Sequence, residues 1–197
     1  MKPNDWIALF GVVAGLIAFL SGLYQYIKAQ QWKKAEFVAK EIKEFEADTQ
    51  INLAMQMLDW NSREYDLLRE SSKAEKKVLI TDENLCMALI PHTAQPSGFE
   101  PYQVIIRDVF DQLLDSFEKF EHFIQSGLVA HNDFKPYLIY WIKIIGNRDS
   151  GRKTEEFYTC LWAYIDFYGY NGVQSFIKRF GFDISFKRSN NQSQKKV

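Results

Sequence analysis

Four side chains of types that bind metal ions recur along one stretch of the chain: Asp111, Asp115, Glu118 and His122. The first two, and likewise the last two, are four residues apart, so on a helix each pair shares one face. Carboxylates and an imidazole presented in this way are ligands of metal sites in helical bundles. Together with Asp108, they also fit the solvated back of an amphipathic helix. We favour the solvated face and expect no metal, because bundle sites point inward and no second helix supplies a Glu-x-x-His motif.

Arg107 and three histidines are the remaining candidates for acid–base chemistry: His92, His122 and His131. The histidines fall in separate segments, and none accompanies a Ser or Cys in a nucleophile motif. We therefore interpret them as structural or surface residues. The alternative is a hydrolase or nuclease in which Arg107, the acidic residues and a histidine such as His92 or His122 act together.

A basic loop contains Arg148, Arg152 and Lys153 around Gly151, just before an expected helix start. The N-terminus of a helix carries free N–H groups and partial positive charge, so an anion or phosphate could bind there. Arg107 would join this site if the fold brought it close. The loop could equally be solvated, or could contact anionic lipid headgroups.

The chain has no charged residue between Trp6 and Ile27. As a helix this run spans about 33 Å, enough for the roughly 30 Å hydrocarbon core of a bilayer. A signal peptide has a shorter apolar region followed by small residues, whereas this run ends in Tyr24, Gln25, Tyr26 and Ile27. We expect an uncleaved transmembrane anchor over residues 1–28.

The basic residues around this run predict its orientation. Lys2 precedes it, and five lysines follow it: Lys28, Lys33, Lys34, Lys40 and Lys43. By the positive-inside rule, the N-terminus lies outside an inner (cytoplasmic) membrane and the C-terminal domain lies in the cytoplasm. Cys86 and Cys160 fall in that domain, where they need not pair, and their spacing is not that of a metal site.

Small residues recur every three or four positions in the anchor: Ala8, Gly11, Gly15, Ala18 and Gly22. This spacing places them on one helical face, where they would let two backbones approach closely. We expect homo-oligomerisation through this face. A different partner helix, or the general abundance of Gly and Ala in membrane helices, would also account for the pattern.

The rest of the chain has the composition of one globular domain. Net charge is −1 and 25% of residues are charged, which makes nucleic acid an unlikely partner, because nucleic-acid-binding domains are distinctly basic. Apolar residues at helical spacing predict that the anchor helix continues to about residue 58. We assign residues 29–60 to this stalk. A helical domain over 61–182 and a polar flexible tail over 183–197 follow.

The periodicity predicts a mainly α fold: a transmembrane helix, a stalk and a helical bundle with a possible short β-hairpin. Expected helices cover about 82–90, 102–125, 133–145, 154–168 and 171–180, delimited by Asp or Thr caps and by Gly and Pro. Residues 78–81 are either a strand paired with 65–68 or a turn. The dense C-terminal aromatics are interpreted mainly as core, and a partner groove is the alternative.

Two aromatic stretches, "PYLIYWIKII" and "LWAYIDFYGYNGVQSFIKRFG", carry a resemblance. With the overall layout, they resemble uncharacterised small bacterial single-pass membrane proteins with a helical cytoplasmic domain. The layout is also similar to the accessory membrane proteins of RNA-targeting CRISPR systems, in which an anchor carries a HEPN-like domain and assembles into an oligomeric pore. HEPN catalysis needs an Arg followed about four to six residues later by His as general acid or base. In "RDVFDQ" Gln112 occupies that place after Arg107, so the resemblance implies assembly without RNase chemistry.

The first hypothesis is therefore a non-enzymatic membrane protein that assembles in the lipid bilayer and docks a cytoplasmic protein partner. The resemblance implies an accessory role in bacterial defence or stress signalling. The alternative is a membrane-tethered hydrolase or nuclease that uses Arg107 and the acidic residues. No cofactor motif is present, so no cofactor is expected.

Overall fold

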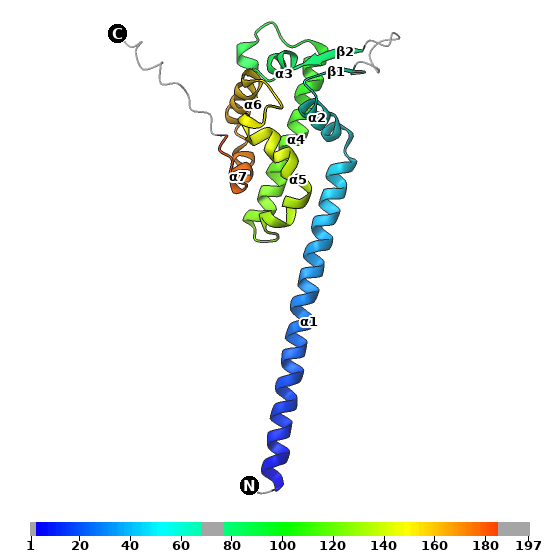
Figure 1. The fold of residues 1–197 in the computed structure, drawn as a ribbon, viewed down its shortest axis with the longest axis vertical. Helices are drawn as coiled ribbons and strands as arrows, with labels where there is room; N and C mark the ends of the chain where they lie inside the picture. The colour runs from blue at the N-terminus through cyan, green and yellow to red at the C-terminus, as the bar shows by residue number, and fades with distance from the viewer. Residues whose placement is uncertain (1–2, 68–76, 185–197) are drawn as a thin grey trace, which may run out of the picture. The chain divides into compact units, whose positions relative to one another are not determined.

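A computed structural model describes residues 3–67 and 77–184, with side chains from residue 10 onward (Figure 1). The chain divides into two units, residues 1–41 and 42–197. We refer to the described part of the second unit as the body. The body is mainly α-helical, with one two-stranded sheet, which confirms the predicted fold class. Most of the predicted tail over 183–197 lies outside the described residues.

The first helix, α1 (Pro3–Ala47), contains the uncharged run. By length and composition it is long and apolar enough to cross a membrane, and it is the one such helix among the described residues. None of its apolar window is buried within the structure. Large side chains such as Phe10 and Phe19 are exposed, at 70% and 67%.

The predicted unbroken stalk to about residue 58 is wrong. Helix α1 ends at Ala47 and α2 (Thr49–Asp59) begins after an extended residue, Asp48. One carboxylate oxygen of Asp48 accepts the Gln50 and Ile51 N–H groups at 2.8 and 3.1 Å. The other accepts the Gln112 side-chain amide at 3.0 Å. Asp is among the best N-cap residues, so Asp48 starts a new helix without any Pro or Gly, and residues 42–60 belong to the body.

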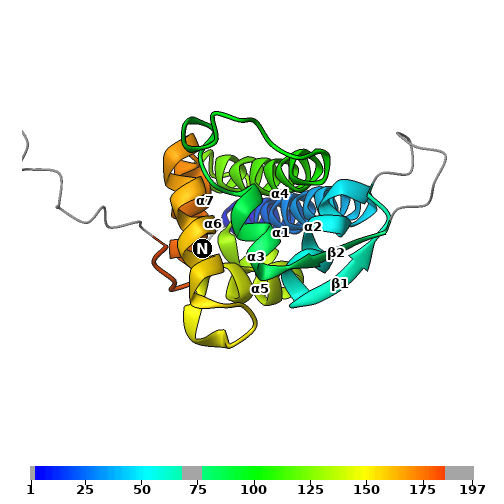
Figure 2. The same ribbon diagram turned by 90° about the horizontal axis from the view of Figure 1, so that it is seen from above.

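A short hairpin lies at one edge of the body (Figure 1, Figure 2). Strands β1 (Ser62–Tyr65) and β2 (Val78–Thr81) are antiparallel, with Ser62 opposite Thr81. The predicted strand at 78–81 is confirmed, but its partner begins three residues earlier than expected. Thr81 then caps α3 (Asp82–Ala88), because its hydroxyl accepts the Asn84 N–H while the Asn84 side chain accepts the Thr81 N–H.

Four further helices build the rest of the body: α4 (Pro101–Gln125), α5 (His131–Gly146), α6 (Glu155–Tyr168) and α7 (Asn171–Arg179). Short 3₁₀ turns cover His92–Ala94 and Arg148–Ser150. These helices confirm the predicted ones, although α5 starts two residues before Asp133, whose carboxylate accepts the Ala130 N–H at 2.6 Å. Helix α4 packs against α2, α3 and α7, and α6 packs against α3 and α7 (Figure 2).

The core of the body is rich in aromatic rings. Phe120 of α4 packs on Phe134 of α5, with ring centres 4.7 Å apart, and Phe117 stacks on Phe176 of α7 at 5.5 Å. Phe45, near the end of α1, packs on Phe120 at 5.5 Å. Seven apolar residues at helical spacing predict the inner face of α4, and six of them are buried: Ile106, Val109, Phe110, Leu113, Phe117 and Phe120. The seventh, Ile124, is half-buried.

Candidate functional site

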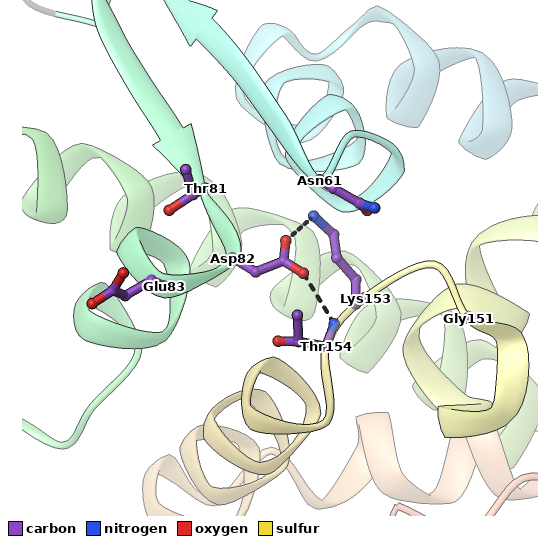
Figure 3. Close-up of a pocket in the computed structure, with 7 residues that line it drawn as sticks. All are labelled: Asn61, Thr81, Asp82, Glu83, Gly151, Lys153 and Thr154. Atoms are coloured by element: carbon purple, nitrogen blue, oxygen red, sulfur yellow. Dashed lines mark hydrogen bonds and ion pairs between the residues drawn. The ribbon is translucent and has the colours of Figure 1, made fainter.

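A buried ion pair joins the starts of α3 and α6 (Figure 3). The Lys153 ammonium donates to the Asp82 carboxylate at 2.7 Å and to the Trp60 carbonyl at 2.7 Å. The second Asp82 oxygen accepts the Thr154 N–H at 3.0 Å. The Lys153 side chain is 0% exposed, and this burial lowers the pKa of Lys153 although Asp82 opposes the shift. One lysine thereby ties together the end of α2, the start of α3 and the start of α6.

A pocket opens beside this pair, lined by Asn61, Thr81, Asp82, Glu83, Gly151, Lys153 and Thr154 (Figure 3). A helix N-terminus such as that of α6 attracts anions. Here the carboxylate of Asp82 already contacts the Thr154 N–H, and the Thr154 hydroxyl accepts the Phe157 N–H at 3.3 Å. Protein groups therefore already accept two of the N–H groups at this helix start.

The other two residues of the predicted anion site have different carboxylate partners. Arg148 pairs with Glu155 at 3.0 Å and lies over the Trp162 ring at 4.5 Å. Arg152 approaches Asp59 at 3.7 Å. The structure thus distributes the basic loop over separate ion pairs, and anion binding by Arg148, Arg152 and Lys153 stays a prediction.

Arg107 has several interactions at the C-terminal end of α3. Its guanidinium donates to the carbonyl of Ala88, the last residue of α3, at 2.7 Å and to that of Ile90 at 2.8 Å. It also lies over the ring of Phe99, 4.4 Å from the ring centre. A helix leaves its last carbonyls without partners, so Arg107 acts as a C-terminal cap supplied by a neighbouring helix.

Tyr168, at the end of α6, joins Arg107 to His92. Its hydroxyl accepts from Arg107 at 2.6 Å and from the His92 backbone N–H at 3.2 Å. The same hydroxyl lies 2.8 Å from His92 Nδ1. The fold therefore brings two sequence candidates together through a tyrosine that sequence reasoning missed. His122 lies in the last turn of α4 and His131 packs against Phe180.

The acidic residues of α4 do not form a uniformly solvated face, so the preferred interpretation is wrong at two of them. Asp111 accepts the hydroxyls of Tyr164 and Tyr170 at 2.6 and 2.9 Å. Glu118 accepts the Gly172 and Val173 N–H groups at 2.7 and 3.0 Å, at the start of α7. The turn between α6 and α7 covers this part of α4, which helical periodicity alone could not show.

Gly172 is a further residue that sequence reasoning missed. A Cβ atom there would lie 2.8 Å from the carboxyl carbon of Glu118, closer than atoms of real side chains approach. Glycine at this position lets the backbone of α7 reach the carboxylate. The spacing of Gly169 and Gly172 marked a turn but gave no sign of this contact.

Asp108, Asp115 and His122 are exposed. The pKa of Asp115 is raised, first by partial burial and then by the neighbouring charges of Asp111 and Glu118. Burial is also the first cause of the raised pKa values of Tyr164 and Tyr170, with Asp111 second. Across residues 3–67 and 77–184, no group of three or more His, Cys, Asp or Glu side chains is placed to hold a metal ion.

Glu121 was not singled out from the sequence, yet it is fully buried. Arg179 of α7 binds it with two hydrogen bonds of 2.7 and 2.8 Å, and Gln125 donates to it at 3.0 Å. Its position one turn after Phe117, on the apolar face of α4, was the available signal. The ion pair anchors the end of α7 on α4.

Cys86 of α3 and Cys160 of α6 form a disulfide, with Cα atoms 5.3 Å apart. The two residues are 74 positions apart in the sequence, and both are half-buried. The sequence left this pairing open, because both cysteines fall in a domain expected to face the cytoplasm, where thiols are usually kept reduced.

Among the described residues, no side chain covers the glycines of the small-residue face of α1. A Cβ added at Gly11, Gly15 or Gly22 would meet no atom within 4 Å, and Ala18 is exposed. The side chain of Ala8 lies outside the described residues. This face is open to contact from outside the chain.

Comparison of the chain with protein-family models, with curated proteins and with solved structures found no match. What the protein does is therefore inferred from its own residues.

Proposed function

We propose that this chain is a single-pass membrane protein of the inner (cytoplasmic) membrane, whose helical body serves as a cytoplasmic interaction and oligomerisation module. The observation that carries this proposal is the apolar part of α1, which is long enough to span a bilayer and is not buried by the other residues that the structure describes. Apolar surface of this extent needs an apolar environment. Lipid supplies one, and a helix can cross lipid because it satisfies its own backbone hydrogen bonds.

The lysines that follow the apolar run support a cytoplasmic body. Five of them lie in residues 28–43, against one lysine before the run. The positive-inside rule counts such residues near the ends of a transmembrane segment. The N-terminus is accordingly outside, and the body faces the cytoplasm, where a protein partner would dock.

The contacts of the candidate catalytic groups support a non-enzymatic role. Arg107 bonds to two backbone carbonyls and a tyrosine, while Asp111 and Glu118 bond to hydroxyl and backbone donors of α6 and α7. Groups engaged in this way hold helices together. A catalytic site instead needs an oriented base beside room for a reacting atom.

Self-association through the small-residue face completes the proposal, and substitution of Gly15 tests it. Gly15→Leu places a bulky side chain where two backbones would meet, and model helix interfaces of this kind are lost when close approach is blocked. We expect crosslinked dimers or higher oligomers of the full-length protein in membranes to fall by about tenfold, equal to roughly 1.4 kcal/mol of association energy.

Two control variants separate the face from general effects on the anchor. Leu16→Ala removes bulk beside the face, and Ser21→Leu adds bulk about a quarter turn away from it. Both should crosslink like the wild type. Equal loss in Ser21→Leu and Gly15→Leu, or no loss in Gly15→Leu, would contradict association through this face.

A further inference from the structure

We infer that Cys86 and Cys160 form a reversible, redox-sensitive disulfide that controls how firmly residues 82–100 are held on the body. The bond joins the middle of α3 to the middle of α6. The inference extends the proposed function by giving the body a means of regulation. The inference depends on the proposed cytoplasmic location in one respect, because the cytoplasm would supply the thiols that reduce the bond.

Helix α3 depends on its neighbours for its structure. It has seven residues, and isolated helices of that length are not stable in water. Its start is held by Asp82, through Lys153 and Thr154. The carbonyls near its end are held by Arg107, which is in turn held by Tyr168 of α6. Leu85 and Ala88 of α3, and Leu89 just after it, are also buried in the core. The disulfide lies between the two polar attachments and is the covalent link between α3 and α6.

The segment that follows α3 has few attachments of its own. In residues 91–100, no side chain is buried, and the contacts that tie His92 to the body go to Tyr168 and Phe167. Regions with exposed backbone and few buried contacts open at low free-energy cost. Loss of the crosslink therefore loosens α3 and this segment before it affects the aromatic core between α4 and α7.

The cysteines are placed for exchange with soluble thiols, because both are half-buried rather than enclosed. A thiolate of one cysteine attacks a low-molecular-weight disulfide such as glutathione disulfide and releases one thiolate. The second cysteine thiolate then displaces the other thiol from the mixed disulfide. Two electrons pass to the reagent, and the two cysteine protons go to the two thiols released. Excess thiol reverses both steps.

In the cytoplasm, the Cys86–Cys160 bond would open and close with the redox state of the thiol pool. Cytosolic thiol pools keep most cysteines reduced, and disulfides found there are usually transient or redox-sensing. The reduced state would then be the resting one, and oxidation would fasten α3 to α6. In an oxidising compartment the same bond would be permanently closed.

Hydrogen exchange of the full-length protein in detergent tests the inference. Wild type is compared after oxidation by glutathione disulfide and after reduction by dithiothreitol, with alkylation and mass spectrometry reporting the state of both cysteines. We expect closure of the Cys86–Cys160 bond on oxidation, and at least about tenfold faster exchange in residues 82–100 on reduction. Exchange in 110–121 and 173–177 should stay within about twofold, and reoxidation should restore the original pattern.

The double variant Cys86→Ser, Cys160→Ser should show the same hydrogen exchange in residues 82–100 as the reduced wild type. Its exchange should not change on treatment with glutathione disulfide or dithiothreitol. If it does not fold, the reversible comparison within the wild type decides the question. Cysteines that stay alkylatable after oxidation, or exchange in 82–100 that does not respond, would overturn the inference. Faster exchange throughout the body would also overturn it, because the bond would then support the whole fold. These outcomes do not depend on topology, so they are separate from the outcome for the proposed function.

Discussion

Asp82→Ala is expected to destabilise the body by about 3–5 kcal/mol, the loss typical when one partner of a buried ion pair is removed. The variant leaves the fully buried Lys153 ammonium without its carboxylate and the Thr154 N–H without its acceptor. Urea unfolding of the full-length protein in detergent, followed by the fluorescence of Trp60, Trp141 and Trp162, measures the change in the free energy of unfolding.

Two matched variants make this experiment specific. Glu155→Ala breaks the Arg148 pair, whose side chains are 36% and 64% exposed, and should cost less than about 1 kcal/mol. The double variant Asp82→Ala, Lys153→Met removes both buried charges and should recover about half of the loss or more, because an apolar replacement avoids the unpaired charge. A single variant as stable as the wild type would show that the pair does not hold α3 and α6 together.

Arg107→Ala is expected to destabilise the body by about 2–4 kcal/mol. The variant leaves two carbonyls without the Arg107 donor and leaves the Tyr168 hydroxyl with its His92 contacts alone. Unsatisfied buried polar groups cost about 1–3 kcal/mol each, part of which water recovers here. The variant also removes the cation that lies over the Phe99 ring. The same urea experiment measures the loss, and Arg63→Ala serves as the control, because Arg63 is exposed and rests over Trp60.

The Arg107 variant also separates the two functional hypotheses. The full-length protein is assayed on RNA, DNA and nucleotides with Mg²⁺, Mn²⁺ and Zn²⁺, beside Arg107→Ala and His122→Ala. We expect no hydrolysis from the wild type, because the acidic residues of α4 face different partners and His122 lies apart from Arg107. Hydrolysis that disappears in either variant, without a matching loss of stability, would favour the tethered enzyme.

Much of the fold could be predicted because it depends on local signals. The spacing of Phe and Leu residues predicted the buried face of α4, and Thr81, Thr154 and the glycines near residues 169–172 marked helix ends. Such signals depend on residues within one or two helical turns of one another, so they do not depend on how distant segments pack.

The misses have a common physical origin in contacts between distant segments. Asp48 ends α1 partly through Gln112, which lies 64 residues away. Asp111 and Glu118 sit opposite the apolar face of α4 but receive hydrogen bonds from α6 and α7. The pairing of Cys86 with Cys160 depends on how α3 packs against α6. Periodicity describes one face of one helix, and it does not tell which neighbour will cover the opposite face.

The topology of the full-length protein tests the central claim most directly. Reporters that are active only in the cytoplasm or only outside the inner membrane are fused in turn to the C-terminus, and each fusion is recovered from washed membranes. The account predicts that the protein stays in the membrane fraction and that only the cytoplasmic reporter is active, since five lysines follow the apolar run. Activity of the external reporter, or release of the protein by a carbonate wash, would contradict it.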